Sequence, residues 1–157
     1  MASPAAIGAG IGGGAVAVAG TSYAAYTQLR PYDDFSDYAR RNWFSFIYET
    51  DEKIKEKIRN GGDGTAEGYR KYLKDELESI KGTGDGMLTD EDVTNAGKDN
   101  DTGGAKLTKV VEKVKAWCTT EEKKKPQGEN GKVDWSKIEA DVNWKKYEKL
   151  CLEPPKK

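Results

Sequence analysis

Histidine is absent from this chain of 157 residues. Its absence removes the usual acid–base group at neutral pH, the commonest metal ligand, and every nucleophile that depends on a neighbouring imidazole. Cys118 and Cys151 are the only cysteines. Two thiols without histidine do not complete a structural zinc site unless carboxylates fill the other positions, which is unusual. We therefore expect no catalytic residues and no metal-binding residues, and we do not expect an enzyme.

Charge is missing from one end of the chain. No acidic or basic residue occurs before Arg30, whereas the whole sequence holds 26 basic and 27 acidic residues, for a net charge of -1. This near balance gives the protein no overall attraction for nucleic acid. The sequence therefore divides into an uncharged leader, residues 1–29, and a charged domain, residues 30–157.

The leader carries the glycine spacing of a dinucleotide-binding turn, with Gly8, Gly10 and Gly13 in the stretch AAIGAGIGGGAVAVAG. Such a turn requires a buried strand before the first glycine and a second strand that ends in an acidic residue. Residues 3–7 contain a proline and two alanines, which are poor strand formers. Asp33 lies near the required distance, but no apolar run precedes it. We therefore expect no bound nucleotide and no cofactor.

A membrane segment or an export signal accounts for the leader better. Residues 2–29 run without charge for longer than the roughly 20 residues that cross a bilayer. Small residues recur four apart, as in Gly8 with Gly12 and Ala15 with Ala19, a spacing that packed membrane helices use. The charged start of a cleaved signal is missing, so we favour a retained single-pass anchor. A flexible Gly/Ala leader is the other alternative.

The charged domain has the pattern of an all-α fold. Apolar residues recur at steps of three and four, and no stretch alternates like a strand. A largely aromatic stripe that includes Phe35, Ala39 and Trp43 predicts a helix with a buried face over residues 33–59. Further helices are predicted over residues 65–80, from a Thr89–Asp92 capping box, and up to Cys118. A last helix is predicted from Asp134, and it is either bent near Asn143 or covered on two sides, because its apolar residues lie on two faces. We expect a small up-and-down bundle of about four amphipathic helices.

One glycine-rich turn, at residues 81–92, resembles the calcium-binding loop of an EF-hand. With Gly86 in the sixth position, Asp85 is fifth and Asp92 is twelfth. The first position is then Lys81, whose ammonium group repels calcium. A small calcium-responsive binding module that uses this degenerate turn is our alternative function.

The two cysteines end successive predicted helices. Antiparallel packing of these helices would place Cys118 near the start of the last one, and about 17 residues of helix would separate the sulfurs by roughly 25 Å. Only a bend near Asn143, or a connection long enough for a parallel return, would bring the two cysteines together. We predict two free thiols, whereas a disulfide would place the domain outside the cytoplasm.

Two features together resemble the large families of paralogous, uncharacterised proteins that haemotropic mycoplasmas encode. The first is the start MASPAAIGAGIGGGAVAVAGTSY, and the second is a lysine-rich helical domain with the stretch VEKVKAWCTT, where Trp117 and Cys118 close a helix. The chain differs from that pattern because a further helix and YEKLCLEPPKK follow the Trp-Cys pair. The resemblance implies an antigenic surface or membrane-associated protein with no assigned activity.

These observations predict a single-pass protein of the cell membrane, anchored by residues 2–29, whose domain interacts with a protein partner of unknown identity. Arg30, Arg40 and Arg41 follow the leader and favour the cytoplasmic side by the positive-inside rule. The resemblance favours the outer face, where we expect the domain.

Overall fold

The structure is a computed structural model that describes residues 30–64, 66–84 and 86–155. The predicted anchor over residues 2–29 lies outside these described residues. Within them, no helix combines the length and the apolar character needed to span a membrane. The helical domain is one compact unit, Tyr32–Lys157.

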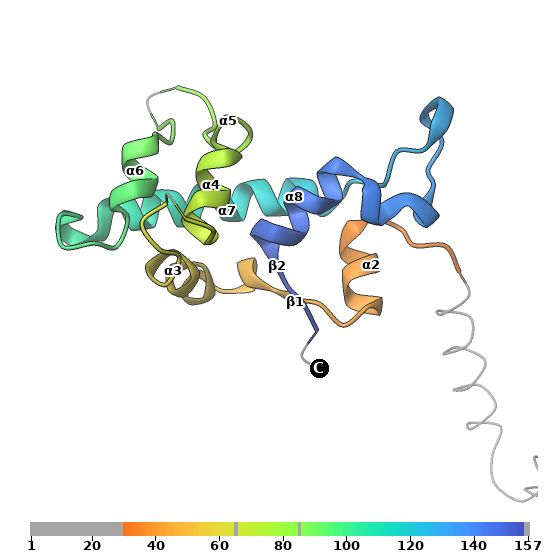
Figure 1. The fold of residues 1–157 in the computed structure, drawn as a ribbon, viewed down its shortest axis with the longest axis horizontal. Coiled ribbons are helices and arrows are strands. Elements are labelled where there is room, and N and C mark those ends of the chain that lie inside the picture. The colour runs from red at the N-terminus through yellow and green to blue at the C-terminus, as the bar shows by residue number, and fades with distance from the viewer. Residues whose placement is uncertain (1–29, 65, 85, 156–157) are drawn as a thin grey trace, which may run out of the picture. The chain divides into compact units, whose positions relative to one another are not determined.

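Helices make up most of this domain, as predicted (Figure 1). The α-helices are α2 (Phe35–Arg41), α3 (Asp51–Arg59), α4 (Tyr69–Asp75), α5 (Leu77–Ile80), α6 (Asp90–Asn95), α7 (Ala105–Glu121) and α8 (Val142–Cys151). Short 3-10 helices are η2 (Ile47–Glu49), η3 (Thr102–Gly104), η4 (Glu129–Gly131) and η5 (Trp135–Ala140). Two short strands, β1 (Ser45–Phe46) and β2 (Leu152–Glu153), pair antiparallel with Phe46 opposite Leu152.

The predicted long helix over residues 33–59 is wrong, because the chain breaks twice within it. Helix α2 ends at Arg41, and β1 and η2 precede the start of α3. The Thr50 side chain caps α3 by accepting a hydrogen bond from Lys53 N at 3.4 Å, and two acidic residues fill its first turn. Trp43 lies in the first break, and its side chain is 81% exposed instead of buried.

The helix predicted over residues 65–80 is also divided. Helix α4 begins only at Tyr69, and Glu76 separates it from α5. Its start is set by a close approach of two glycines, since a Cβ atom on Gly68 would lie 2.8 Å from Gly61 O. Glycine is therefore required where the two segments meet.

The capping box at the start of α6 is confirmed. Thr89 Oγ1 accepts a hydrogen bond from Asp92 N at 3.1 Å, and Asp92 Oδ2 accepts one from Thr89 N at 3.0 Å. These two bonds satisfy N–H groups that a helix start leaves without partners.

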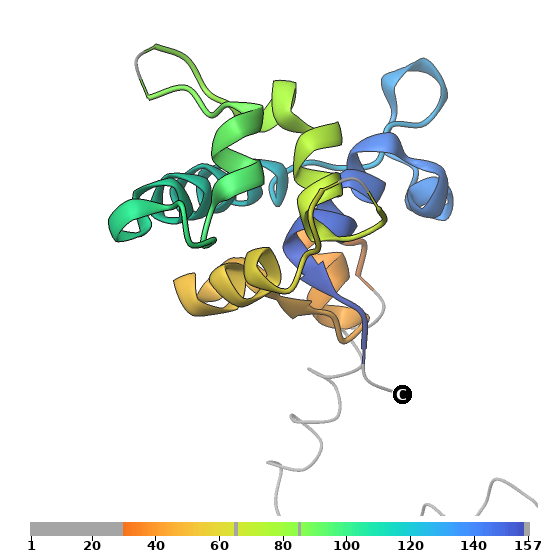
Figure 2. The ribbon, with the colours of Figure 1, turned by 60° about the vertical axis from the view of Figure 1, so that its left-hand side comes forward.

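The last predicted helix consists of two helices in the structure. Asp134 caps η5 by accepting a hydrogen bond from Ser136 N, and Asp141 caps α8 by accepting one from Trp144 N. The chain changes direction at Asp141, close to the bend predicted near Asn143. The loop that contains η4 stands away from the other helices in both views (Figures 1 and 2).

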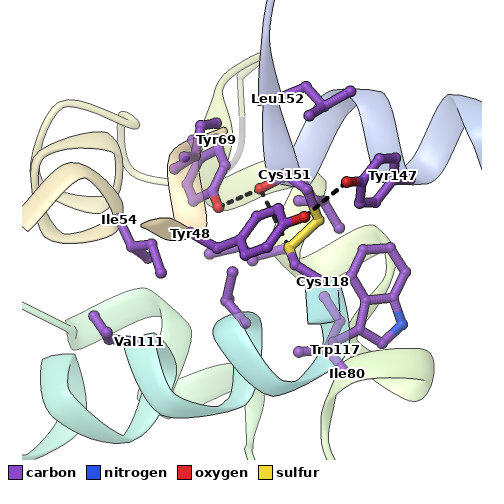
Figure 3. Packing of buried hydrophobic residues seen from close by; sticks show 14 of the residues in the cluster. Tyr48, Ile54, Tyr69, Ile80, Val111, Trp117, Cys118, Tyr147, Cys151 and Leu152 are labelled. Carbon is purple, nitrogen blue, oxygen red and sulfur yellow. Dashed lines mark hydrogen bonds between the residues drawn. A yellow bond between two sulfur atoms is a disulfide. The ribbon is translucent and has the colours of Figure 1, made fainter. Parts of the chain in front are cut away.

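The core forms around α7 and α8. Trp144, Tyr147 and Leu150 of α8 are completely buried, as is Phe35 of α2. The Phe35 and Trp144 rings meet edge to face with their centroids 5.4 Å apart. Ile54 of α3 and Val111 of α7 extend the same cluster (Figure 3). Residues from both ends of the charged domain therefore share one core.

The prediction of two free thiols is wrong, because Cys118 and Cys151 form a disulfide with their Cα atoms 5.7 Å apart (Figure 3). The last helix was expected to begin at Asp134, but α8 begins only at Val142 and is ten residues long. The long connection between Glu121 and Val142 lets the end of α8 return to the last turns of α7. Simple antiparallel packing of the two helices is therefore wrong as well.

Candidate functional site

The EF-hand-like turn was the predicted alternative site, and its carboxylate at Asp92 already has partners. Besides capping α6, Asp92 Oδ2 accepts a hydrogen bond from Lys109 Nζ at 2.7 Å. Burial raises the pKa of Asp92, but Lys109 and the Thr89 hydrogen bonds outweigh burial and lower it. Asp85, the other predicted acidic ligand, lies outside the described residues.

Lysines surround the rest of the turn. Lys81 Nζ lies 2.6 Å from Glu78 Oε2. Lys113 reaches over the turn from α7, so that a Cβ atom on Gly82 would lie 2.8 Å from Lys113 Nζ. No group of three or more acidic or cysteine side chains in the described ranges could hold a metal ion. The ammonium groups make this turn unfavourable for a cation.

A hydrogen-bonded group of tyrosines surrounds the disulfide (Figure 3). Tyr48 OH donates to Glu122 Oε2 and lies 2.9 Å from Tyr147 OH, and Tyr69 OH donates to Leu150 O at 2.7 Å. Burial is the main cause that raises the pKa of each of these tyrosines above its ordinary value. The three phenols are therefore neutral at physiological pH and serve to satisfy buried polar groups.

A small groove runs between α4 and α8, with a volume of about 200 Å³. Tyr72, Val142 and Leu150 give it an apolar lining, and lysines of α8 stand beside it. Lys149 Nζ lies 5.1 Å from the centroid of the Tyr72 ring, a cation–π contact. Sites for small molecules usually hold about 300–1,000 Å³, so this groove fits one side chain of a partner better than a cofactor.

The carboxylates along α4 and α5 pair with lysines. Asp75 Oδ2 lies 2.6 Å from Lys71 Nζ, and Glu76 Oε2 lies 2.7 Å from Lys146 Nζ. Such pairs at the surface contribute little to stability, and they do not form the apolar setting that acid catalysis requires.

The most unusual residue of the domain is Trp43. It follows the C-terminal end of α2 with a φ of 64°, in the left-handed region, although it is a bulky residue. Trp43 N donates to Arg40 O at 3.2 Å, and Phe44 N donates to Ala39 O at 3.0 Å. This pair of bonds is the Schellman motif, in which glycine is the usual residue at the Trp43 position.

A shallow hollow of about 390 Å³ lies beside Trp43. Arg40 and Lys53 bring positive charge to its lining, and Glu49 brings negative charge. The Arg40 guanidinium carbon lies 5.4 Å from the centroid of the Phe46 ring. We call the lining of this hollow the Trp43 surface, which consists of Arg40, Trp43, Phe44, Ser45, Phe46, Glu49 and Lys53.

Sequence reasoning missed the Trp43 surface because the aromatic spacing placed Trp43 on the buried face of a continuous helix. Thr50, followed by Asp51 and Glu52, was a helix-start pattern inside that stretch and could have indicated the break.

Comparison with known protein families, curated proteins and solved structures finds no match.

Proposed function

We propose that this is an exported, single-pass membrane protein whose disulfide-linked helical domain binds partners at the outer face of the cell. The observation that carries the proposal is the buried disulfide between Cys118 and Cys151. Disulfides persist in oxidising compartments and are rare in the cytosol. A stable bridge in the core therefore supports a domain that folds after export.

The arginines that follow the leader are weaker evidence for a cytoplasmic domain than the positive-inside rule suggests. Arg40 and Arg41 belong to helix α2, and the Arg41 guanidinium carbon lies 4.2 Å from the centroid of the Tyr32 ring. The Arg41 side chain therefore has a role within the folded domain. The disulfide is therefore the stronger argument, and it supports the outer face.

The resemblance to the paralogous families of haemotropic mycoplasmas agrees with this proposal. Those families share the Gly/Ala leader, the lysine-rich helical domain and a Trp-Cys pair, here Trp117 and Cys118. In this chain the cysteine of that pair is half of the disulfide. We infer a surface role of the same kind, without catalysis.

Protease treatment of intact cells tests the location of the domain. We expect added protease to digest residues 30–157 without lysis. Mass spectrometry of the unreduced protein should show the Cys118–Cys151 bridge. A protected domain with two thiols that react with an alkylating reagent would contradict the proposal.

Arginine substitutions test the anchor itself. Replacing Ile11 and Val16 by arginine should release the protein from membranes, since a charge at the centre of a spanning helix costs roughly 2.5–3.5 kcal/mol on insertion scales. Ser3→Arg, near the end of the leader, is the matched control and should stay bound. Unchanged retention of the double variant would rule out a spanning helix in the leader.

The calcium-responsive module has less support, because Lys109 holds Asp92 and Lys113 covers the turn. A calorimetric titration of the whole protein with calcium tests this alternative. We expect no heat of binding at millimolar calcium.

A further inference from the structure

The fold does not require tryptophan at position 43. The Schellman motif is formed by backbone bonds alone, and the left-handed conformation there favours glycine. The side chain is 81% exposed, so it contributes little to the core. A bulky aromatic side chain held at a strained backbone position that favours glycine is the kind of outlier from which a functional role is inferred.

The charges around Trp43 indicate the chemistry of that interaction. Lys53 Nζ lies 3.3 Å from Glu49 Oε2, which leaves this pair without net charge. Arg40 is exposed and makes no ion pair with a carboxylate of the described residues. The Trp43 surface therefore combines one exposed indole with one guanidinium that makes no ion pair among the described residues.

We propose that the Trp43 surface rests on the headgroup region of the lipid bilayer, with the Trp43 indole at the interface and Arg40 beside lipid phosphates. This inference rests on the proposed membrane anchor. Tryptophan concentrates at membrane–water interfaces because its ring is apolar while its N–H group is polar. Arginine next to it can donate paired hydrogen bonds to lipid phosphates, which both leaflets contain.

The length of chain between the leader and Trp43 supports this choice of partner. Trp43 follows the last leader residue by 14 positions, seven of which form α2. At about 1.5 Å per helical residue and 3.3 Å per extended residue, this segment spans at most roughly 35 Å. An anchored leader would therefore hold Trp43 near the membrane, and the tether would make a weak surface contact sufficient.

Quenching of tryptophan fluorescence by brominated lipids tests the inference on the full chain. The protein is placed in vesicles of phosphatidylcholine with a minority of phosphatidylglycerol, brominated in the upper acyl chain. The other tryptophans are Trp117, Trp135 and Trp144, of which Trp144 is completely buried and Trp117 is 9% exposed. Trp43→Phe should remove most of the quenching, whereas the control Trp135→Phe should keep it.

Flotation of the same vesicles separates this inference from the proposed anchor. Protein that floats with the vesicles but shows equal quenching in wild type and Trp43→Phe keeps its anchor and overturns the inference. A third outcome is protein that floats, shows no quenching by the brominated lipid, and keeps Trp43 shielded from iodide. The Trp43 surface would then be covered by another protein or by a second copy of this chain, which also overturns the inference. Protein that does not float overturns both proposals.

Discussion

Single residues of this domain show where the side chain and the backbone favour different structures. Trp43 takes the left-handed conformation that glycine adopts at no cost, while its aromatic side chain lies in solvent. The periodicity of aromatic residues placed Trp43 in the core, because the apolar spacing continues past Arg41, where helix α2 ends. The burial of Phe35 and Ala39, earlier in the same stripe, was predicted correctly because α2 continues through them.

Trp43→Gly should stabilise the domain. A left-handed residue with a Cβ atom costs roughly 1–2 kcal/mol, and glycine relieves this cost, so we expect the free energy of unfolding to rise by about 1 kcal/mol. Urea unfolding provides the measurement. Trp43→Ala is the matched control, because it removes the ring but keeps the Cβ atom. An equal gain in both variants would assign the effect to the exposed ring instead of the backbone.

Arg70 is a buried residue whose loss should destabilise the domain strongly. It is 1% exposed, and its guanidinium donates to Val93 O at 2.6 Å and to Ala96 O at 2.7 Å at the end of α6. Arg70→Met would leave both carbonyl groups buried without these donors. We expect a loss of about 3 kcal/mol of unfolding free energy.

Lys71→Met, one position along, is the control for Arg70→Met. Lys71 forms a surface ion pair with Asp75 at 2.6 Å, a kind of contact worth at most about 1 kcal/mol. Similar losses of unfolding free energy in the two variants, measured by urea unfolding, would show that the hydrogen bonds from Arg70 to the carbonyl groups of α6 do not stabilise the domain.

At the scale of elements, the helix start with a capping box was predicted better than the breaks between helices. Thr89 and Asp92 gave the start of α6 correctly because a capping box is local in sequence. The break between α4 and α5 at Glu76, and the contact between Gly61 and Gly68, depend on packing between segments that are separate in sequence. Local patterns do not report such contacts.

Asp101 joins two elements and should make stability depend on pH. Its carboxylate accepts hydrogen bonds from Gly97 N at 2.7 Å, and from Lys106 N and Leu107 N at the start of α7 at 2.8 and 2.9 Å. Burial raises the pKa of Asp101, but these three bonds outweigh burial and lower it. The stabilisation is therefore complete above the unfolded-state pKa of about 4, and is lost as pH falls towards the lower folded-state pKa.

Asp101→Asn should remove this dependence. We expect the variant to be less stable than wild type by about 2 kcal/mol at pH 7, and the difference to shrink as pH falls below about 4. Urea unfolding across this pH range measures it. Asp99→Asn, an exposed position in the same loop, is the control and should follow wild type. A difference that stays constant with pH would show that the Asp101 charge does not matter.

For the whole molecule, the disulfide joins the two helices that carry much of the core. The bridged cysteines are 33 positions apart, and a closed loop of this size lowers the entropy of the unfolded chain by an amount worth roughly 4 kcal/mol. Cys118→Ala/Cys151→Ala should lose about this amount in urea unfolding. Wild type in reducing agent should behave like the double variant, and equal stability with and without reducing agent would contradict the role of the bridge.

The sequence predicted the helical class of the charged domain better than the pairing of its cysteines. The helical class follows from apolar residues that recur at steps of three and four. The disulfide depends on where α8 starts and on how the connection after α7 returns, and both are set by tertiary packing around Trp144 and Tyr147.

Deletion of residues 2–29 tests whether the domain folds by itself. The buried hydrophobic residues of the described chain lie between Phe35 and Leu152, and they form one cluster. The urea midpoint of the domain should therefore match that of the full chain, and the helix content by circular dichroism should fall by no more than the roughly 20 residues of a spanning leader. The shortened protein should stay in solution without detergent. The control is the full chain in detergent under the same oxidising conditions. Aggregation, or a loss of helix larger than the leader itself accounts for, with the Cys118–Cys151 bridge intact, would mean that the leader completes the core and is not a separate membrane segment.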